Sequence, residues 1–373
     1  MRRLTLALHN ALYNVARPVL FRQSAQEAHE SLLRLLAQID DDKRTLHLLK
    51  RLHQLTTVNH LLPIGGTILD YPLILAAGFV KGHGFASEIN ALNAVAKGEN
   101  IIPGWRSVPT LVGIVEFGSF TRHPRLGNEG TTLWRHPASK SLQNRIGLKN
   151  PGVAAASEFL RQRKLDLQPI FGINIAVTPH QNDPYIQIDE TLLGIHSFID
   201  KGVIPSWFTL NLSCPNTDED PHGNQTEQLA QALCSAITKE LAQSAHKVPL
   251  WVKVSPDLAD NQLRILMSVF AETGVCAVIA TNTLAQPTPD NLSVQAGMSG
   301  SNLFTHGLRT ARTLQQARFN LAAPVDVIAC GGVMDGKTLL AYKALGISVA
   351  QCWSAFIYRG PLALQVIESE AND

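Results

Sequence analysis

The sequence predicts a TIM (β/α)8 barrel with an N-terminal helical subdomain. From residue 73 onward, short apolar runs rich in β-branched residues alternate with stretches of helical periodicity. Continuous apolar character is typical of parallel strands that are buried on both faces. Eight such runs favour a closed barrel over an open doubly wound sheet, and no Gly-x-Gly-x-x-Gly follows an early strand to indicate a Rossmann domain. The expected strands are Leu73–Ala76, Val112–Phe117, Ile170–Ile175, Trp207–Leu212, Leu250–Val254, Ala277–Ala280, Val325–Ala329 and Val349–Trp353.

Residues 1–58 form the expected helical subdomain, and residues 59–373 form the barrel. Apolar residues recur at helical spacing from residue 4 to residue 20, and Pro18 is expected to kink or end this first helix. Ser24-Ala25-Gln26-Glu27 is a capping-box pattern that opens a second helix. A third helix is expected after Asp40-Asp41-Asp42, where leucines again recur at helical spacing.

The N-terminal segment is basic as well as apolar. Residues 1–58 contain nine Lys or Arg against five Asp or Glu, a net charge of +4. Such a segment suits a membrane surface or the entrance for an apolar ligand. The alternative is a helical cap that packs on the main domain. The sequence contains no stretch of about 18 uninterrupted apolar residues, so no membrane-spanning helix is predicted.

Composition excludes several function classes. The whole chain has a formal net charge of +2, and its basic residues are scattered rather than interleaved with aromatic residues, so no nucleic-acid interface is expected. The five cysteines are odd in number and widely spaced, without a Cys-x-x-Cys pair. We therefore expect neither a disulfide framework nor a metal site, and a reducing cytosol is the natural environment.

The stretch Thr209–Thr217 carries the strongest sign of a functional site. A β-rich run stops abruptly in a polar turn that contains Asn211, Ser213, Cys214 and Asn216. The thiol can act as a base or a nucleophile, and the amides can hold a planar polar ligand. The alternative is a strand end capped by turn residues, with Cys214 as a small buried hydrophobic residue.

Small and polar residues also follow the other expected strands, at the end of a barrel where active sites lie. Glycines after the seventh strand and Trp353-Ser354 at the end of the eighth suit a phosphate that is held by backbone N–H groups. Lys253 stands inside the apolar fifth strand, so it must point into the barrel mouth and needs an anionic partner. The N1/O2 side of a reduced flavin is such a partner.

Together these motifs resemble the dihydroorotate dehydrogenases, and the resemblance covers nearly the whole chain. The helical lead-in, Leu20-Phe21-Arg22 through Ala28-His29-Glu30, is similar to the quinone-linked, membrane-associated class. The matching motifs are Ala76-Ala77-Gly78-Phe79-Val80-Lys81, Asn144-Arg145-Ile146-Gly147, Gly172-Ile173-Asn174-Ile175, Asn211-Leu212-Ser213-Cys214-Pro215-Asn216-Thr217, Val252-Lys253-Val254-Ser255-Pro256-Asp257-Leu258, Ala280-Thr281-Asn282-Thr283 and Ser299-Gly300.

The resemblance implies an FMN site, a substrate site and a catalytic base. Cys214 is the implied base. Orotate is a flat, anionic ring edged with carbonyl and N–H groups, which amides read in both directions and a lysine neutralises. The implied substrate residues are Lys81, Asn144, Arg145, Gly147, Asn211, Asn216, Asn282 and Thr283, and the implied FMN residues are Ala77, Gly78, Ser119, Asn174, Asn211, Lys253, Thr281, Gly300, Gly331, Gly332, Trp353 and Ser354.

The expected activity is therefore the FMN-dependent oxidation of dihydroorotate to orotate with a quinone acceptor, at the cytoplasmic face of a membrane. Cysteine as the base is typical of the soluble class, which leaves a soluble acceptor and a soluble cytoplasmic enzyme open. Val80, Leu148 and Asp218–Asp220 also depart from the family pattern, and residues 85–111 are longer than its usual first helix and loop. Two alternatives remain: a related flavin enzyme acting on another cyclic amide, and a flavin-free phosphate-binding barrel.

Overall fold

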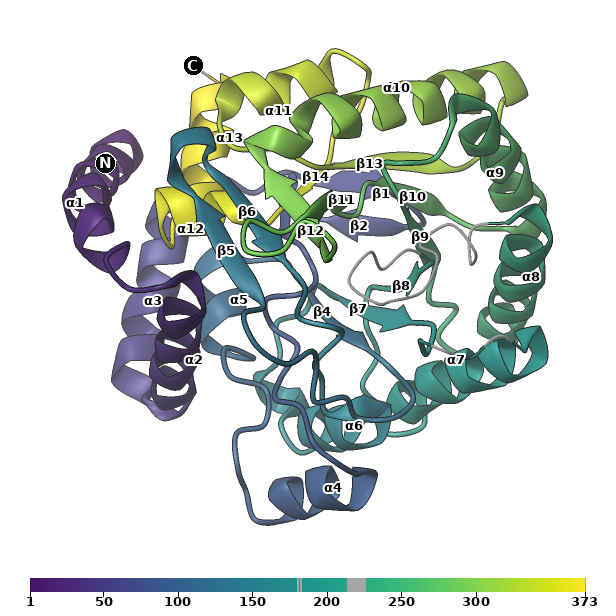
Figure 1. Ribbon diagram of the computed structural model, residues 1–373, viewed down its shortest axis with the longest axis horizontal. Helices are drawn as coiled ribbons and strands as arrows, with labels where there is room; N and C mark the ends of the chain where they lie inside the picture. The colour runs from purple at the N-terminus through teal and green to yellow at the C-terminus, as the bar shows by residue number, and fades with distance from the viewer. Residues whose placement is uncertain (180, 182, 213–225, 373) are drawn as a thin grey trace.

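The chain folds into a closed barrel of parallel strands surrounded by helices, as the computed structural model shows (Figure 1). The structure describes residues 1–179, 181, 183–212 and 226–372. Within these residues, eight strands close the barrel: β3 (Leu73–Leu75), β4 (Val115–Phe120), β7 (Phe171–Ala176), β8 (Trp207–Asn211), β9 (Leu250–Val254), β10 (Ala277–Ala280), β13 (Asp326–Cys330) and β14 (Ala350–Cys352). Each pairs with the next in chain order, and β14 pairs with β3, so the predicted TIM barrel is confirmed.

The expected strand Val112–Phe117 is wrong by three residues, whereas the other expected strands agree with the structure to within one residue. Val112 instead ends helix α5 (Ser107–Val112). Gly113 follows with a φ of 89°, a conformation that glycine adopts without strain, and the chain turns there into β4. Gly118 and Ser119 therefore lie inside the strand rather than after it.

An irregularity in β4 directs its polar residues. The register between β4 and β7 shifts between Phe117 and Phe120, as in a β-bulge. A side chain at Gly118 would place its Cβ 2.5 Å from the carbonyl oxygen of Asn174, so only glycine fits this close approach. The shift changes the direction of the following side chain, Ser119.

A hairpin closes the amino-terminal end of the barrel. It consists of β1 (Leu62–Ile64) and β2 (Thr67–Leu69). The indole N–H of Trp251 donates to the carbonyl oxygen of Gly65 at 2.8 Å, and the Gly65 N–H donates to Asp326 at 2.7 Å. Trp251 also stacks on Trp207, with ring centroids 4.3 Å apart. These contacts fill the bottom of the barrel and leave its opposite end for a ligand.

A four-stranded antiparallel sheet, which the sequence did not predict, stands beside the carboxyl end of the barrel. Its order is β11 (Leu284–Pro287), β12 (Gln295–Gly300), β6 (Ser141–Asn144) and β5 (Leu133–His136). The segments come from chain positions more than a hundred residues apart, and the sheet joins the segment after β4 to the segment after β10. It forms one wall of the pocket described below.

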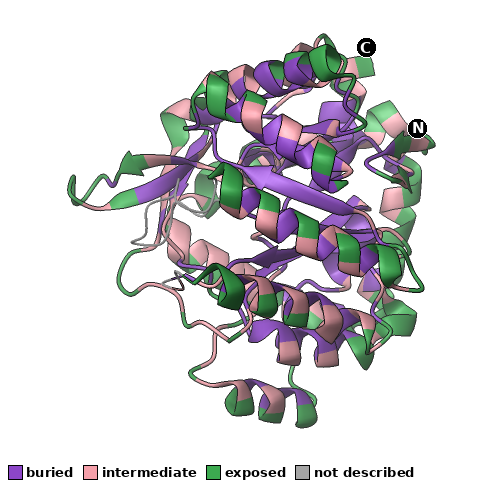
Figure 2. Cartoon of the chain, turned by 90° about the vertical axis from the view of Figure 1, so that its right-hand side faces the viewer, coloured by how far each residue is buried: buried purple, intermediate pink, exposed green. Residues whose placement is uncertain are grey.

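Helices cover the outside of the barrel, with buried inner faces and exposed outer faces (Figure 2). The long 85–111 segment contributes α4 (Glu88–Ala96) and most of α5, and α4 packs against α6 (Gly152–Arg161) at the edge of the molecule (Figure 1). Around the barrel, the described residues also form α7 (Pro184–Ile199), α8 (Glu227–Gln243), α9 (Asp260–Thr273), α10 (Phe304–Leu321), α11 (Gly336–Lys343), α12 (Ser354–Arg359) and α13 (Ala363–Asn372).

Three helices form the N-terminal segment: α1 (Arg2–Leu20), α2 (Ala25–Asp41) and α3 (Lys43–Thr56). The predicted capping box is present, since the Ser24 hydroxyl accepts from the Glu27 N–H and Glu27 accepts from the Ser24 N–H. Helix α1 continues past Pro18 and ends at Leu20.

Asp40 anchors α2 to the barrel. Its carboxylate is fully buried and accepts from the Gly104 N–H at 2.7 Å and from the Ser107 N–H at 2.8 Å. Burial raises the pKa of Asp40, against these bonds, which lower it. The buried carboxylate thus ties α2 to the start of α5.

Candidate active site

A pocket opens at the carboxyl end of the barrel strands. Its polar lining comes from the ends of β3, β4, β8, β9, β10, β13 and β14, and its apolar wall includes Leu133 and Leu142 of the antiparallel sheet. Active sites of this fold lie at the same end. The expected residues that line the pocket are Ala77, Gly78, Lys81, Ser119, Asn144, Gly147, Asn211, Lys253, Thr281, Asn282, Thr283, Gly300, Gly331, Gly332, Trp353 and Ser354.

Two expected residues are placed differently, and two others are not described. Asn174 is fully buried beneath the pocket rather than part of its lining. The guanidinium of Arg145 turns to the carbonyl oxygen of Glu129, 3.3 Å away, and is not part of the lining either. Cys214 and Asn216 lie outside the described residues.

Glycines make room for a ligand on the β13 and β14 side. Gly331 and Gly332 have φ values of 131° and 68°, which residues other than glycine rarely adopt. A Cβ on Gly332 would lie 2.5 Å from that of Phe304, so the loop can approach α10 only as glycine. After β14, the Ser354 hydroxyl donates to the Ser299 hydroxyl at 2.9 Å. The two loops thus present backbone N–H groups and hydroxyls, a donor set that suits a phosphate.

Lys253 lies on the pocket floor with only 6% of its surface exposed. Its ammonium group donates to the side-chain oxygen of Gln351 at 3.1 Å. No ion pair to this lysine forms among the described residues. A buried ammonium group needs a compensating negative charge, and an anionic ligand edge in the pocket supplies one.

Glu116 is the centre of a buried network below the pocket, and sequence reasoning missed it. It is fully buried on β4 and accepts from Asn174 at 2.8 Å, Thr209 at 2.8 Å and Gln351 at 3.0 Å. The indole N–H of Trp207 also donates to it, at 3.0 Å. Glu116 stands between apolar residues in the strand segment Val115-Glu116-Phe117. A charged residue inside an apolar strand is the signal by which Lys253 was found, and it could have identified Glu116 as well. The network fixes both Asn174 and, through Gln351, the ammonium group of Lys253.

Asn174 leaves one polar atom unused. Its amide N–H donates to Glu116, whereas its side-chain oxygen is buried without a hydrogen-bond partner among the described residues. An unpaired buried acceptor of this kind costs about 1–3 kcal/mol unless a ligand donates to it. A flavin ring carries both an N–H donor and an anionic edge when reduced. The Asn174 oxygen, Lys253 and the glycine loops therefore fit a flavin with a phosphate.

Amide side chains continue the polar surface toward β8 and β10. Asn282 donates to the side-chain oxygen of Asn211 at 3.3 Å, and Asn211 donates to the Ser119 hydroxyl at 3.3 Å. The side-chain oxygen of Asn282 in turn accepts from the Thr283 N–H at 2.8 Å. This chain of amides brings together the ends of β4, β8 and β10, and it offers both donors and acceptors to a planar ligand.

A metal centre is not part of the site in the described part of the chain, where no cluster of three or more His, Cys, Asp or Glu could hold an ion. In the same part of the chain, none of the helices combines the length and the apolar character that a membrane span requires.

A second cavity, almost wholly apolar, lies between the N-terminal helices and the barrel. Leu133, Leu142 and Trp353 line both this cavity and the pocket, so the two adjoin. Its polar residues include His29 and Arg135. Burial lowers the pKa of His29 to about 4, with Lys81 and Lys149 adding to the effect, so its imidazole is neutral near pH 7. Its Nδ1 has no partner among the residues described.

The family profile described as "Dihydroorotate dehydrogenase" matches residues 64–373. The chain belongs to the dihydroorotate dehydrogenase family. Curated proteins named "Dihydroorotate dehydrogenase (quinone)" are similar over nearly the full length. The one from Chromobacterium violaceum is 30% identical, and the match covers 94% of each chain. The one from Bordetella avium is 32% identical, and the match covers 95% of each chain. The predicted resemblance is thus confirmed.

A solved dihydroorotate dehydrogenase structure shares the fold. The crystal structure of DHODH from Eimeria tenella in complex with ferulenol superposes with a TM-score of 0.71, at 22% identity, over 94% of this chain and 93% of that one. Family membership makes the chain an oxidoreductase of the dihydroorotate dehydrogenase type, and the family's flavin chemistry accords with the donor set of the pocket.

Proposed function

We propose that the protein oxidises dihydroorotate to orotate with FMN as its cofactor and a quinone as the electron acceptor. One observation carries the proposal. A buried lysine, a glycine-lined donor set and a row of strand-end amides meet in one pocket, and an unpaired buried amide oxygen lies beneath it. The quinone-linked names of relatives that match nearly the whole chain support the acceptor.

The chain's own residues divide the pocket between cofactor and substrate. Bound FMN supplies the hydride acceptor. Lys253 and Asn174 would hold its ring, while Gly300, Gly331, Gly332 and Ser354 would hold its phosphate, because these groups provide the charge and the donors described above. The phosphate side argues for FMN rather than a dinucleotide, since the sequence has no dinucleotide-binding fingerprint.

On the substrate side, Lys81 would neutralise the carboxylate of dihydroorotate, and Asn144, Asn211 and Asn282 would read its carbonyl and N–H edges. Cys214 would remove the proton next to the substrate carbonyl, since a thiol has an ordinary pKa of about 8.5 and can lose its proton near neutrality. Asn216 would join the amide set. These roles remain proposals for both Cys214 and Asn216, which lie beyond the described part of the chain.

The test is anaerobic mixing of the purified protein with dihydroorotate in a stopped-flow instrument. We expect one noncovalent FMN per chain and bleaching of its absorbance, followed by recovery of the colour when a ubiquinone analogue is added. A colourless protein would favour a flavin-free barrel. A yellow protein that dihydroorotate does not bleach would favour a related enzyme acting on another cyclic amide.

The apolar cavity is the proposed quinone route. It adjoins the flavin pocket at Trp353, and neutral His29 and Arg135 are polar groups that could bind quinone carbonyls. Ala28 on α2 lines the cavity. Ala28→Phe should fill it and lower turnover with ubiquinone analogues, while bleaching by dihydroorotate stays at the wild-type rate. Gln38→Phe, on the exposed side of the same helix, is the matched control.

A soluble acceptor is the other outcome of this experiment. Ala28→Phe would then leave quinone turnover unchanged, and fumarate would reoxidise the flavin faster than quinone does. The acceptor would follow the cysteine base, which is typical of the soluble class, rather than the helical lead-in, which is similar to the quinone-linked class.

We also propose that residues 1–58 act as a unit that contacts a membrane surface. The apolar side chains of α1 that face away from the barrel are exposed, with Leu4 at 74% and Val15 at 77%. The exposed side is defined by Leu4, Leu8, Leu12, Val15 and Val19, and helix α1 stands at the edge of the molecule in Figure 1. Together with the net charge of +4 it suits anionic lipid headgroups and acyl chains.

Leu8→Ser with Leu12→Ser should reduce co-sedimentation with vesicles of phosphatidylcholine and anionic phosphatidylglycerol. Leu165→Ser, at a 95% exposed leucine outside the N-terminal helices, is the control. Equal sedimentation of the two variants would favour a soluble cytoplasmic enzyme.

A further inference from the structure

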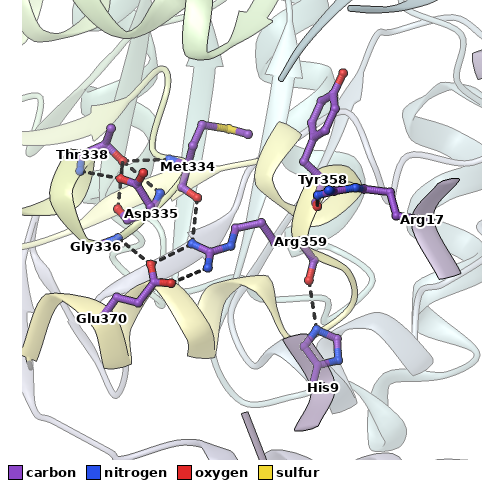
Figure 3. Close-up of polar contacts among 9 residues, drawn as sticks. All are labelled: His9, Arg17, Met334, Asp335, Gly336, Thr338, Tyr358, Arg359 and Glu370. Carbon is purple, nitrogen blue, oxygen red and sulfur yellow. Dashed lines mark hydrogen bonds and ion pairs between the residues drawn. The ribbon is translucent and has the colours of Figure 1, made fainter. Parts of the chain in front are cut away.

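Helix α1 caps the carboxyl end of α12 with its side chains (Figure 3). The last carbonyl oxygens of a helix lack partners within the helix. Here the Tyr13 hydroxyl donates to the carbonyl oxygen of Ile357 at 2.6 Å, and Arg17 donates to that of Tyr358 at 2.9 Å. His9 Nε2 lies 3.0 Å from the carbonyl oxygen of Arg359. Three consecutive carbonyls of α12 are thus satisfied by a helix from the other end of the chain.

The residue after α12 is adapted to this contact. Gly360 has a φ of 82°, and a Cβ there would lie 2.6 Å from the ring of Tyr13. Glycine at this position both ends α12 and lets the Tyr13 ring approach its last turn. The cationic side chain of Arg17 at this end also interacts favourably with the helix dipole of α12. Residues of both α1 and the end of α12 are therefore adapted to this contact.

The capped end connects to both loops on the phosphate side of the pocket. Trp353 and Ser354, at the start of α12, line the pocket. From the end of α12, Arg359 donates to the carbonyl oxygen of Met334 at 3.2 Å, and Met334 belongs to the pocket lining after β13. Arg359 also pairs with Glu370 at 2.7 Å, and Glu370 accepts from the Gly336 N–H at 2.9 Å (Figure 3).

We propose that Tyr13 and Arg17 of α1 are positioning residues for the phosphate end of the cofactor. They hold α12, and through α12 and Arg359 they set the positions of the loops that carry Gly331–Met334 and Trp353–Ser354. The N-terminal segment would then serve the flavin as well as the acceptor side. The inference rests on the proposed function, because it presumes that FMN occupies the pocket.

The experiment compares FMN with riboflavin, which lacks the phosphate. Full-length apoprotein is titrated with each flavin, and quenching of flavin fluorescence gives the dissociation constants. In the variant Tyr13→Phe with Arg17→Met, we expect the FMN dissociation constant to rise about 5- to 20-fold, as for the loss of one or two hydrogen bonds. The riboflavin constant should stay within about twofold of wild type, because the ring end is held by Lys253 and Asn174.

Controls separate this role from general destabilisation. Arg22→Met removes a positive charge just beyond α1, and Asn14→Ala changes an exposed residue of α1; both should leave the constants unchanged. Gly360→Ala, which forces Tyr13 away by steric contact, should reproduce the selective loss for FMN and carries the test if the double variant does not fold.

Equal weakening of FMN and riboflavin, or wild-type affinities for both in the double variant and Gly360→Ala, would overturn the inference while leaving the proposed function intact. Wild-type protein that binds neither flavin would overturn the proposed function itself, and this inference with it.

Discussion

Replacing Glu116 by glutamine should disturb both the stability of the barrel and its affinity for flavin. The carboxylate accepts hydrogen bonds from Asn174, Trp207, Thr209 and Gln351. Bonds to a charged acceptor contribute about 1.5–3 kcal/mol each, and bonds to a neutral acceptor about 0.5–1.5 kcal/mol. Four bonds that each lose about 1 kcal/mol amount to a loss of about 4 kcal/mol in the free energy of unfolding.

The effect on the flavin follows from the geometry of the two oxygens. Trp207, Thr209 and Gln351 donate to one oxygen of Glu116, and Asn174 donates to the other. In Glu116→Gln the new NH₂ group would face the NH₂ group of Asn174. The Asn174 amide would relieve this by turning over, since its oxygen has no other described partner. A donor would then replace the acceptor offered to the ligand, which should weaken FMN binding by about 10- to 100-fold.

Urea unfolding of the apoprotein and FMN titration measure the two effects. Asp40→Asn is the matched control, because Asp40 is also a fully buried carboxylate with several backbone and side-chain donors but lies outside the pocket. It should lower stability without changing FMN affinity. If Glu116→Gln binds FMN as tightly as wild type, the idea that Glu116 fixes Asn174 is refuted.

Three further predictions address individual side chains. Lys253→Met should leave the purified protein largely without FMN, because it removes the buried ammonium group of the pocket floor; a normal flavin content, measured by absorbance after denaturation, would contradict its role. Cys214→Ala should keep FMN but slow its reduction by dihydroorotate about 10²- to 10⁴-fold, with reoxidation unchanged, in stopped-flow measurements. An unchanged reduction rate would move the base to Ser213. His29 has its pKa lowered from 6.5 to about 4, so between these values the unfolded chain binds more protons and stability falls as the pH falls. Between pH 6.5 and pH 4, the free energy of unfolding of His29→Leu, measured in denaturant titrations, should fall by about 3 kcal/mol less than that of wild type. If the free energies of unfolding of variant and wild type change with pH in parallel, His29 is not a neutral, buried histidine.

The barrel and much of its pocket could be predicted because the relevant signals are local. A parallel strand buried on both faces must be continuously apolar, so runs such as Leu250–Val254 are visible without any knowledge of their neighbours. The carboxyl ends of those strands meet in a barrel, so polar residues that follow each run meet as well. The capping box at Ser24 and Glu27 is likewise a pattern of four adjacent residues.

The position of β4 shows where local reasoning fails. Val112 is as apolar and β-branched as Val115, and the run between them has no polar break. The helix α5 extends over Val112 because Ser107 and Gly104 dock on buried Asp40, a partner far away in the chain. The start predicted for β4 from the sequence alone is therefore too early.

By itself, the sequence determined the fold class, the catalytic end of the barrel and most of the residues that line the pocket, since periodicity and strand-end chemistry are written in short segments. The tertiary structure alone decided how distant residues pair. Glu116 meets Gln351, Tyr13 meets Ile357, and the strand β6 meets β12 across the mouth of the barrel. Such contacts have no local signature, because each depends on the closed barrel bringing together segments that are more than a hundred residues apart.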